Sequence, residues 1–278
     1  MRANVCFGLF MLVAGGCGGG ASGTKYTVDF VPLVSGQPFS CTQSYPGIGT
    51  TQSTLSPQEF RMYVSGVTLV RAGGESVPLQ LTNDNMWQGD NIALLDFEDG
   101  TGGCNTASPQ TNFTVIGTAA EHDDYTKVQF TVGIPNDHDH LAAATAAAPL
   151  NQPAMWWSWL GGYRYLKVDV QTTMNPSYFF HLGAMTCSGG SMTTIDCKYP
   201  DLATITLPYA GTNAKVALDL ATLFADSNLD LQPDQVTTFT SGCMSLDGDP
   251  QCPAPYGKLG LAFEDMGTAP AQTFFAVQ

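Results

Sequence analysis

The feature that most constrains the fold is a series of short stretches in which apolar and polar residues alternate, separated by clusters of Gly, Pro, Asn and Asp. Alternation with a period of two gives each extended strand one apolar face, and frequent turn residues favour antiparallel neighbours. The sequence therefore predicts an all-β fold, an antiparallel β-sandwich or barrel-like single domain with short helical excursions. Strands are expected at residues 26–31, 60–70, 77–81, 92–97, 113–117, 128–133, 163–170, 177–181, 204–207, 215–218 and 260–264.

Two segments are helical candidates, an alanine-rich stretch at 141–148 and a short one at 219–225. Asp219 begins the second, where its carboxylate can cap the first turn. Both segments interrupt the strand pattern, so we expect them to be excursions between strands. The sequence shows no repeat and no linker after Gly23, and residues 25–278 are expected to form one domain.

Charge and polarity limit the function classes. The 278 residues include 10 basic and 24 acidic side chains, for a formal charge of −14. Such a field repels nucleic acid and anionic lipid, which argues against binding to either. Charged residues make up 12% of the chain and apolar residues 44%, as expected of a well-packed globule. The acidity suits a cation or a basic partner, or simply solubility outside the cell.

The N-terminus resembles a processing signal. Arg2 precedes an apolar run at residues 5–14, followed by the small residues Ala14-Gly15-Gly16 and then Cys17. This order predicts a signal peptide at 1–16, and a lipidated Cys17 that opens a flexible tether at 17–24. The apolar run is too short to span a membrane, so anchoring would be by lipid alone. We expect an exported periplasmic or outer-membrane lipoprotein; the alternative is ordinary cleavage that leaves a soluble protein.

The cysteine count suits an exported chain. Removal of Cys6 and lipidation of Cys17 leave an even number of cysteines, which predicts three disulfides. Two pairs close short polar loops that contain glycine, and the third follows by elimination. The predicted pairs are Cys187 with Cys197, Cys243 with Cys252, and Cys41 with Cys104. A cysteine-rich metal site is the competing interpretation, but the chain lacks Cys-x-x-Cys spacing.

Histidines are few and grouped. Among four in the chain, His138 and His140 are two residues apart, and His181 follows a run of aromatic residues. If the first segment is extended, both of its imidazoles point to one side and, with His181, offer three nitrogens to copper or zinc. Asp137 and Asp139 could accept the second ring N–H of these ligands. The alternative is that the histidines are exposed and merely charge-paired with the aspartates.

Three of the four tryptophans lie close together in the chain. The histidine pair is followed, a short way along the chain, by Trp156, Trp157 and Trp159, whereas Trp87 is isolated. Dense aromatic residues usually form core, because each ring buries a large apolar area. A chain that folds back across the alanine-rich stretch would instead place indole beside imidazole.

Other sequence patterns give weaker indications of function. The acidic turn at 96–104 could bind calcium, whereas the segment that begins at Asp226 has Leu231 and Thr237 where an EF-hand needs glycine and glutamate. Asx turns are the favoured interpretation of both. The sequence contains no Gly-x-Ser-x-Gly elbow and no phosphate-binding glycine loop. Soft thioethers that could assist Cu(I), or simply fill the core, are Met155, Met185, Met192 and Met244.

Several motifs occur in an order that resembles the MbnP family of copper-binding proteins. The resemblance runs from about residue 27 to about residue 252. The motifs are Phe39-Ser40-Cys41, Phe60-Arg61-Met62-Tyr63-Val64-Ser65, Ile92-Ala93-Leu94-Leu95-Asp96-Phe97-Glu98-Asp99-Gly100-Thr101-Gly102, Pro149-Leu150-Asn151, Trp157-Ser158-Trp159, Gly162-Tyr163, Phe180-His181-Leu182-Gly183 and Gly242-Cys243-Met244-Ser245.

The resemblance implies an exported copper-binding protein that is often encoded beside a MauG-like di-haem enzyme of the cytochrome c class. In such systems the partner oxidises a tryptophan of the copper protein to kynurenine, at or near the metal. Related copper proteins of methane-oxidising bacteria use two histidines and a kynurenine as ligands. The family's Asn-His-x-Asp motif corresponds here to residues 136–140, which leaves both histidines of this segment and all four tryptophans as candidates.

Three hypotheses follow. The first is a copper-binding or copper-trafficking lipoprotein without catalytic turnover, with His138, His140 and His181 as ligands. The second is a secreted zinc enzyme that uses the same nitrogens, with Glu121 or Asp124 as the base. The third is a metal-free surface module that binds a partner through exposed aromatic residues. Elemental analysis after aerobic purification distinguishes copper, zinc and no metal.

Overall fold

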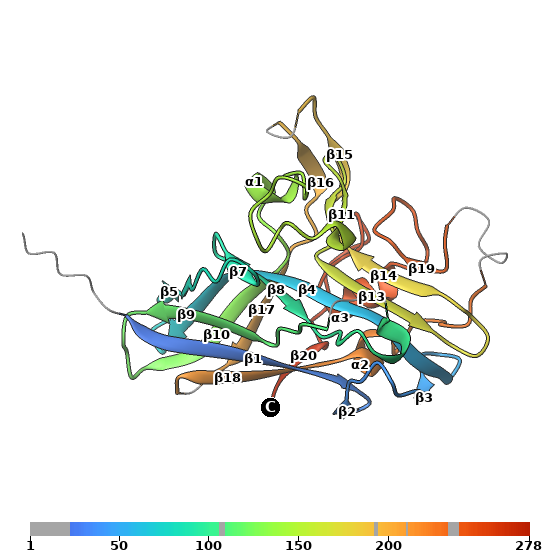
Figure 1. Cartoon of the computed structure of the whole chain (residues 1–278), viewed down its shortest axis with the longest axis horizontal. Coiled ribbons are helices and arrows are strands. Elements are labelled where there is room, and N and C mark those ends of the chain that lie inside the picture. Colours follow the sequence, from blue (N-terminus) through green and yellow to red (C-terminus); the bar gives the residue numbers. More distant parts are fainter. Residues whose placement is uncertain (1–22, 106–108, 192–193, 210, 233–238) are drawn as a thin grey trace, which may run out of the picture.

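The computed structural model describes residues 23–105, 109–191, 194–209, 211–232 and 239–278. Most strands join two large sheets that face each other, and smaller hairpins lie to one side (Figure 1). The elements are β1 (Thr24–Val34), β2 (Gln37–Pro38), β3 (Tyr45–Ile48), β4 (Ser53–Arg71), β5 (Ser76–Pro78), β6 (Gln80–Leu81), β7 (Gln88–Gly89), β8 (Ile92–Asp96), η1 (Gly102–Cys104), β9 (Thr114–Ala119), β10 (Tyr125–Val132), α1 (Asn136–Asp139), η2 (Pro153–Met155), β11 (Trp156–Ser158), β12 (Gly162–Tyr163), β13 (Leu166–Gln171), β14 (Tyr178–Leu182), β15 (Met185–Ser188), β16 (Asp196–Tyr199), β17 (Ala203–Pro208), β18 (Asn213–Asp219), α2 (Leu220–Leu223), β19 (Gly242–Cys243), α3 (Pro253–Lys258) and β20 (Phe275–Val277).

The smaller of the two large sheets has the order β20-β18-β1-β9-β6, with β2 attached to β1. Strand β1 alternates as the sequence predicts, and its buried side chains include Tyr26, Val28 and Phe30. It pairs antiparallel with β9 and parallel with β18, which lies far along the chain.

The larger sheet has the order β17-β10-β4-β13-β14-β19. Its centre is β4, a strand of 19 residues that also pairs with β3, β5 and β8. All these pairings of β4 are antiparallel. The short strand β19 joins β14 in parallel, so the sheet is antiparallel except at this edge.

The core fills the space between the two sheets. Phe30 of the smaller sheet meets Phe130 of the larger sheet edge to face, with ring centroids 5.3 Å apart. Phe275 of β20 packs against the same Phe130 ring at 5.4 Å. Apolar burial between opposed sheets is what defines a β-sandwich, and the predicted all-β sandwich is confirmed.

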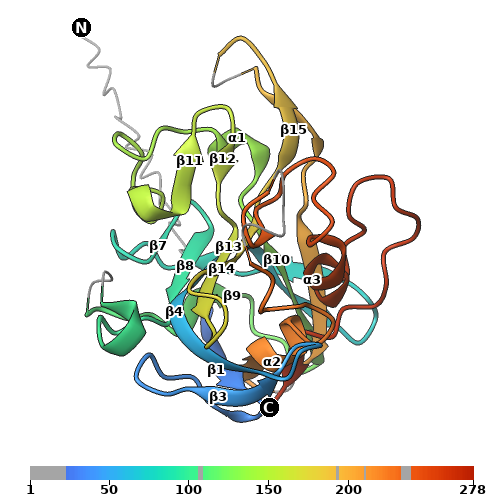
Figure 2. The same cartoon turned by 90° about the vertical axis from the view of Figure 1, so that its right-hand side faces the viewer.

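Three small elements stand on the far side of the larger sheet from β1 and β18. They are α1, the hairpin β11–β12 and the hairpin β15–β16, which gather at the top of both views (Figures 1 and 2). The segment with the tryptophans therefore lies outside the main sandwich core.

The three predicted disulfides are confirmed. Their Cα–Cα distances are 5.6 Å for Cys41–Cys104, 3.9 Å for Cys187–Cys197 and 4.7 Å for Cys243–Cys252. The second joins β15 to β16, and the third ties β19 to the start of α3. No described helix is long and apolar enough to cross a bilayer. The predicted signal peptide, Cys17 and Met192 lie outside the described residues.

Several local predictions need correction. Residues 141–148 form turns instead of a helix, because eight residues before Pro149 are too few to sustain one. The strand expected at 260–264 is also wrong: Gly260 has φ +76° and ends the helix α3, which the sequence analysis missed. The predicted cap at Asp219 is confirmed, since its carboxylate accepts a hydrogen bond from the Ala221 amide at the start of α2.

Candidate metal centre

Trp157 lies in the short hairpin strand β11, and its ring packs on the backbone at Gly183, just beyond the end of β14. A Cβ placed on Gly183 would lie only 2.4 Å from Cζ3 of Trp157. Glycine is therefore required just beyond β14 for the indole to approach the sheet this closely. This contact brings the indole beside His181, with ring centroids 6.3 Å apart.

His181 is held in a defined orientation on β14. Its side chain is buried, and its Nε2 lies 2.6 Å from a carboxylate oxygen of Asp169 on the neighbouring strand β13. Its Nδ1 lies 3.3 Å from Nε of Arg164, which can only donate. The imidazole is therefore neutral, with its proton on Nε2 and its lone pair on Nδ1. Burial lowers the pKa of His181, against the opposing effect of Asp169.

The backbone around His181 is fixed by a buried serine. Ser245 Oγ donates to the His181 carbonyl at 2.8 Å and accepts from the Gly183 amide at 3.0 Å. The same hydroxyl lies 2.6 Å from the Tyr256 hydroxyl in α3. The C-terminal segment thus fixes the position of the end of β14 beside the tryptophan hairpin.

Arg164 connects the imidazole to the indole. Its Cζ lies 4.9 Å from the centroid of the Trp157 ring, a cation–π arrangement. Its Nη1 donates to the backbone carbonyls of Trp156 at 3.0 Å and Ala154 at 3.2 Å. Burial lowers the pKa of Arg164, although the guanidinium stays charged at any physiological pH.

His140 is buried at the end of α1, in a different setting from His181. Its Nδ1 lies 3.1 Å from the Trp159 carbonyl, to which it donates, and its Nε2 is 3.5 Å from Sγ of Cys197. Burial lowers the pKa of His140. Within the described ranges, His140, Cys187 and Cys197 are the one group of at least three potential ligand atoms lying within 4.8 Å of each other. Both sulfurs are bonded in a disulfide, so they cannot act as thiolate ligands.

The expected His-x-His geometry is wrong. Pro135 begins the helical turn α1, so the segment is not extended and the two imidazoles do not lie on one side. His138 is partly exposed and pairs with Asp137 at 2.8 Å. The predicted role of Asp139 also fails, since it lies 3.7 Å from His140 Nε2 and instead accepts hydrogen bonds from the β12–β13 region. The three predicted imidazoles do not share one cluster in the described part of the chain.

The tryptophans differ in their surroundings. Trp159 is 41% exposed, whereas Trp87 is partly buried against the core near β7. Trp156 is partly buried, and its indole Nε1 has no hydrogen-bond partner. Trp157 is the tryptophan whose ring contacts a buried imidazole and a guanidinium. These differences single out Trp157 as the tryptophan of the candidate centre.

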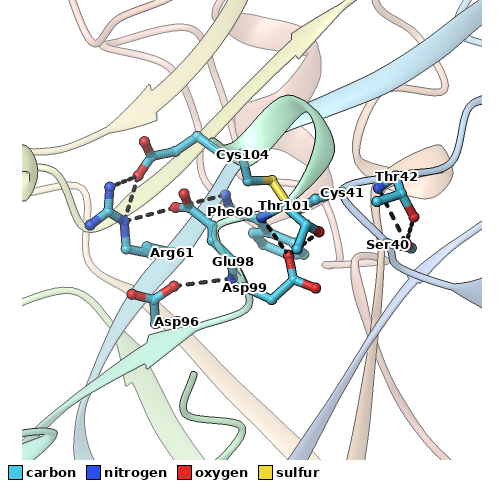
Figure 3. The surroundings of a disulfide bond; sticks show 11 residues. Ser40, Cys41, Thr42, Phe60, Arg61, Asp96, Glu98, Asp99, Thr101 and Cys104 are labelled. Atoms are coloured by element: carbon cyan, nitrogen blue, oxygen red, sulfur yellow. Dashed lines mark hydrogen bonds and ion pairs between the residues drawn. A yellow bond between two sulfur atoms is a disulfide. The ribbon is translucent and has the colours of Figure 1, made fainter. Parts of the chain in front are cut away.

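The acidic turn at 96–104 faces a guanidinium instead of a cation site. Arg61 Nε lies 2.9 Å from Glu98, whose side chain is fully buried (Figure 3). Burial raises the pKa of Glu98 to about 9, aided by a neighbouring carboxylate. Asp99 accepts from the amide and hydroxyl of Thr101, an Asx turn as expected. The described carboxylates of this turn form no calcium-binding group.

A groove of about 700 Å³ opens beside the centre. Trp157 contributes to its wall together with Leu160 and Leu246, which are both partly exposed. Met185 and Met244 line the same groove, so two of the four predicted thioethers reach this region, while Met155 is buried in the core. Trp157 is therefore partly accessible from solvent.

Sequence reasoning missed two residues of the centre, Asp169 and Arg164. Asp169 could have been found, because predicted strands at 163–170 and 177–181 form a hairpin that puts it near His181. The position of Arg164 follows from contacts with three separate elements and has no local signature.

Comparison with known proteins gives a consistent result. The MbnP family model matches residues 23–245, a range that includes Trp157, Arg164, Asp169 and His181. Among solved structures, MbnP from Methylosinus trichosporium is similar with a TM-score of 0.80 and 27% sequence identity, covering 91% of this chain and 98% of that chain. No curated protein matches the chain. The match over most of the sequence and the shared fold show that this chain belongs to the MbnP family.

Proposed function

We propose that this protein binds copper as cargo, with His181 as a ligand and with Trp157 as the tryptophan that is oxidised to kynurenine. Membership of the MbnP family supports a copper-associated role. The observation that carries the finer proposal is a buried, neutral imidazole fixed by Asp169 at 2.6 Å and lying against an indole.

The donor set fits copper in chemical terms. Metal-binding histidines usually donate their second ring N–H to a carboxylate or carbonyl, which fixes the tautomer and leaves one lone pair for the metal. His181 has this arrangement through Asp169, and its Nδ1 is the nitrogen with the lone pair. Imidazole is also a common copper ligand. His140 also donates Nδ1–H to a carbonyl, that of Trp159, which makes it a second candidate ligand even though no described group of ligand atoms joins it to His181.

Oxidation of Trp157 would supply a second donor at the same place. An intact indole is a poor ligand, because its one nitrogen carries a proton and its lone pair belongs to the ring. Kynurenine has an aniline nitrogen and a ketone. The net change consumes the indole, dioxygen and water and yields kynurenine and formate, so the side chain exchanges one carbon for one oxygen. We propose a MauG-like di-haem enzyme as the catalyst.

We further propose that the protein is exported and held at a membrane by lipid on Cys17. Extracytoplasmic copper handling agrees with three disulfides, which persist in oxidising compartments. Because Trp157 lines the groove and is partly accessible, a partner enzyme has room to approach this residue.

Copper titration of variants tests the proposal. Protein co-expressed with the di-haem partner is compared with His181→Ala, Trp157→Phe and the double variant His138→Ala, His140→Ala. We expect His181→Ala and Trp157→Phe to lose tight copper binding. Because His181 is buried and bonded to Asp169, His181→Ala should also lower apo-protein stability, so binding is measured well below the unfolding temperature of each variant. The double variant separates a contribution of His140 from that of His181. Unchanged copper stoichiometry and affinity in both His181→Ala and Trp157→Phe would refute the site.

Tandem mass spectrometry tests the modification independently of copper. Peptides that contain Trp87 and residues 156–159 are compared after expression with an active partner and with an inactive one. We expect the carbon-for-oxygen exchange at Trp157 with the active partner only. Identical spectra in the two samples would mean that these tryptophans are structural.

A further inference from the structure

We infer that Arg164 gates the metal centre: its guanidinium occupies the ligating nitrogen of His181 in the unmodified protein and must leave before copper binds. The inference rests on the proposed copper site at His181. It assigns a positioning role to Arg164 and an order to the events at the centre.

Arg164 already occupies the nitrogen of His181 that a metal would use. Arg164 Nε donates to Nδ1 of His181 at 3.3 Å, so the lone pair that a metal would use already has a partner. The other ring nitrogen is engaged by Asp169 at 2.6 Å and cannot substitute. A metal ion at Nδ1 and the guanidinium would also repel each other, because both are cations at short distance.

No described carboxylate is in direct contact with the Arg164 guanidinium. Its partners are the backbone carbonyls of Ala154 and Trp156, the imidazole of His181 and the ring face of Trp157. None of the described carboxylates forms a salt bridge with it within 4 Å, whereas Arg61 is paired with Glu59 and Glu98. Asp169 and Glu59 attract the guanidinium from beyond 4 Å, and a partly buried cation without a carboxylate in direct contact is retained less strongly than a charge-paired one.

The gate is also linked to the tryptophan. The indole face lies 4.9 Å from Cζ of Arg164 and is one of its four partners. Cation–π attraction is strongest for the intact indole. Opening the five-membered ring removes part of that face, and so it weakens the hold on Arg164 where the new donor nitrogen forms. The hydrogen bond from Arg164 to the Ala154 carbonyl is itself exposed to solvent.

Together these contacts predict that the unmodified protein excludes copper and that modification of Trp157 admits it. Without Arg164, His181 would be open to metal whether or not Trp157 is oxidised. The dependence of affinity on modification should therefore be smaller when Arg164 is absent.

The experiment uses full-length protein made without the partner, so that every indole is intact. Cu(I) affinity is measured by competition with a chromophoric chelator for wild type, Arg164→Met, Arg164→Lys and the double variant Arg164→Met, His181→Ala. Arg71→Met is the matched control, because it removes one positive charge at a partly exposed site where Arg71 pairs with Glu75 and Asp124. Thermal unfolding confirms that each variant is folded.

We expect Arg164→Met to bind Cu(I) at least about tenfold more tightly than unmodified wild type. Arg164→Lys, which keeps a cation, should stay near wild type. The gain should disappear in the double variant with His181→Ala, and Arg71→Met should show none. In partner-modified protein, Arg164→Met should change the affinity much less.

The results separate the two proposals. If modified wild type binds copper through His181 but unmodified Arg164→Met is no better than unmodified wild type, the copper site stands and the gate is overturned. If His181→Ala has no effect in any background, the copper site and the gate both fail. Should Arg164→Met fail to fold, Arg164→Gln, which is shorter and neutral but still polar, removes the cation from Nδ1 of His181 and gives the same test.

Discussion

Asp169 on β13 accepts a 2.6 Å hydrogen bond from Nε2 of His181 on β14, and this single contact decides which ring nitrogen can meet a metal. The two residues lie on adjacent strands of one hairpin, in a register that pairs His181 with Lys167. The Asp169 carboxylate is largely buried, which by itself would raise its pKa. The hydrogen bond to His181 and the nearby cations together outweigh this effect, so the pKa of Asp169 stays below its ordinary value.

Removing the charge of Asp169 should weaken copper binding. We expect Asp169→Asn to lower copper affinity about 10–100-fold, because the tautomer and orientation of His181 are then less well fixed. Copper competition assays on partner-modified protein measure this. Asp123→Asn, an exposed change elsewhere, is the control. Equal affinities for Asp169→Asn and wild type would show that Asp169 does not position the ligand.

The disulfide of the β15–β16 hairpin should contribute to global stability. We expect the double change Cys187→Ser, Cys197→Ser to reduce the free energy of unfolding by about 2–3 kcal/mol, because a short loop regains freedom in the unfolded chain. Urea unfolding followed by fluorescence gives the value. Ser188→Ala, exposed on the same strand, should change it by less than about 0.5 kcal/mol. A loss no larger than that of the control would contradict the assignment of a stabilising bridge.

Burial of Asp201 should make stability depend on pH. Desolvation raises the pKa of Asp201 from 3.8 to about 7 in the folded protein, so the folded state keeps a proton that the unfolded state has released. The contribution of Asp201 is therefore fully present below about pH 4 and is lost as the pH rises through about 7.

Asp201→Asn isolates this effect. Relative to wild type, the variant should gain stability progressively between about pH 4 and pH 7 and keep a constant advantage above that range. Urea unfolding free energies measured across this range give the difference, with Asp123→Asn as the exposed reference. Parallel pH profiles for wild type and Asp201→Asn would mean that Asp201 ionises in the folded protein as it does in the unfolded chain.

Lipid on Cys17 should decide where the protein partitions. We expect wild type made from the full-length gene to enter the detergent phase with a mass that includes acyl chains, since Cys17 follows the small residues of the predicted signal peptide. Cys17→Ala should stay in the aqueous phase without that mass. If both proteins are equally water-soluble, the anchor is absent.

Most strands and the two short-loop disulfides could be predicted from the sequence because their signals are local, and the pairing of Cys41 with Cys104 then followed by elimination. The alternation from Tyr26 to Phe30 matches the buried face of β1, and the loop from Cys243 to Cys252 is short enough to close. The helix predicted for the alanine-rich stretch at 141–148 is absent, because alanine favours a helix only where enough residues and tertiary contacts sustain it.

The centre was only partly accessible for the opposite reason. His181 could be named from its place after three aromatic residues, but the approach of Trp157 depends on the missing side chain of Gly183, which only the folded chain reveals. The predicted shared site of His138 and His140 is wrong because Pro135 starts a helical turn. In such a turn, side chains two residues apart do not point the same way.

The parallel pairing of β1 with β18 has a consequence for how the chain acquires its structure. Val28 of β1 is opposite Ala214 of β18, so the first strand of the domain gains one of its two flanking strands only after residues 213–219 are available. Contacts between such distant segments close large loops and form late. The smaller sheet can therefore be completed only once the far end of the chain is available, an order of folding that is compatible with the proposed export of the chain before it folds.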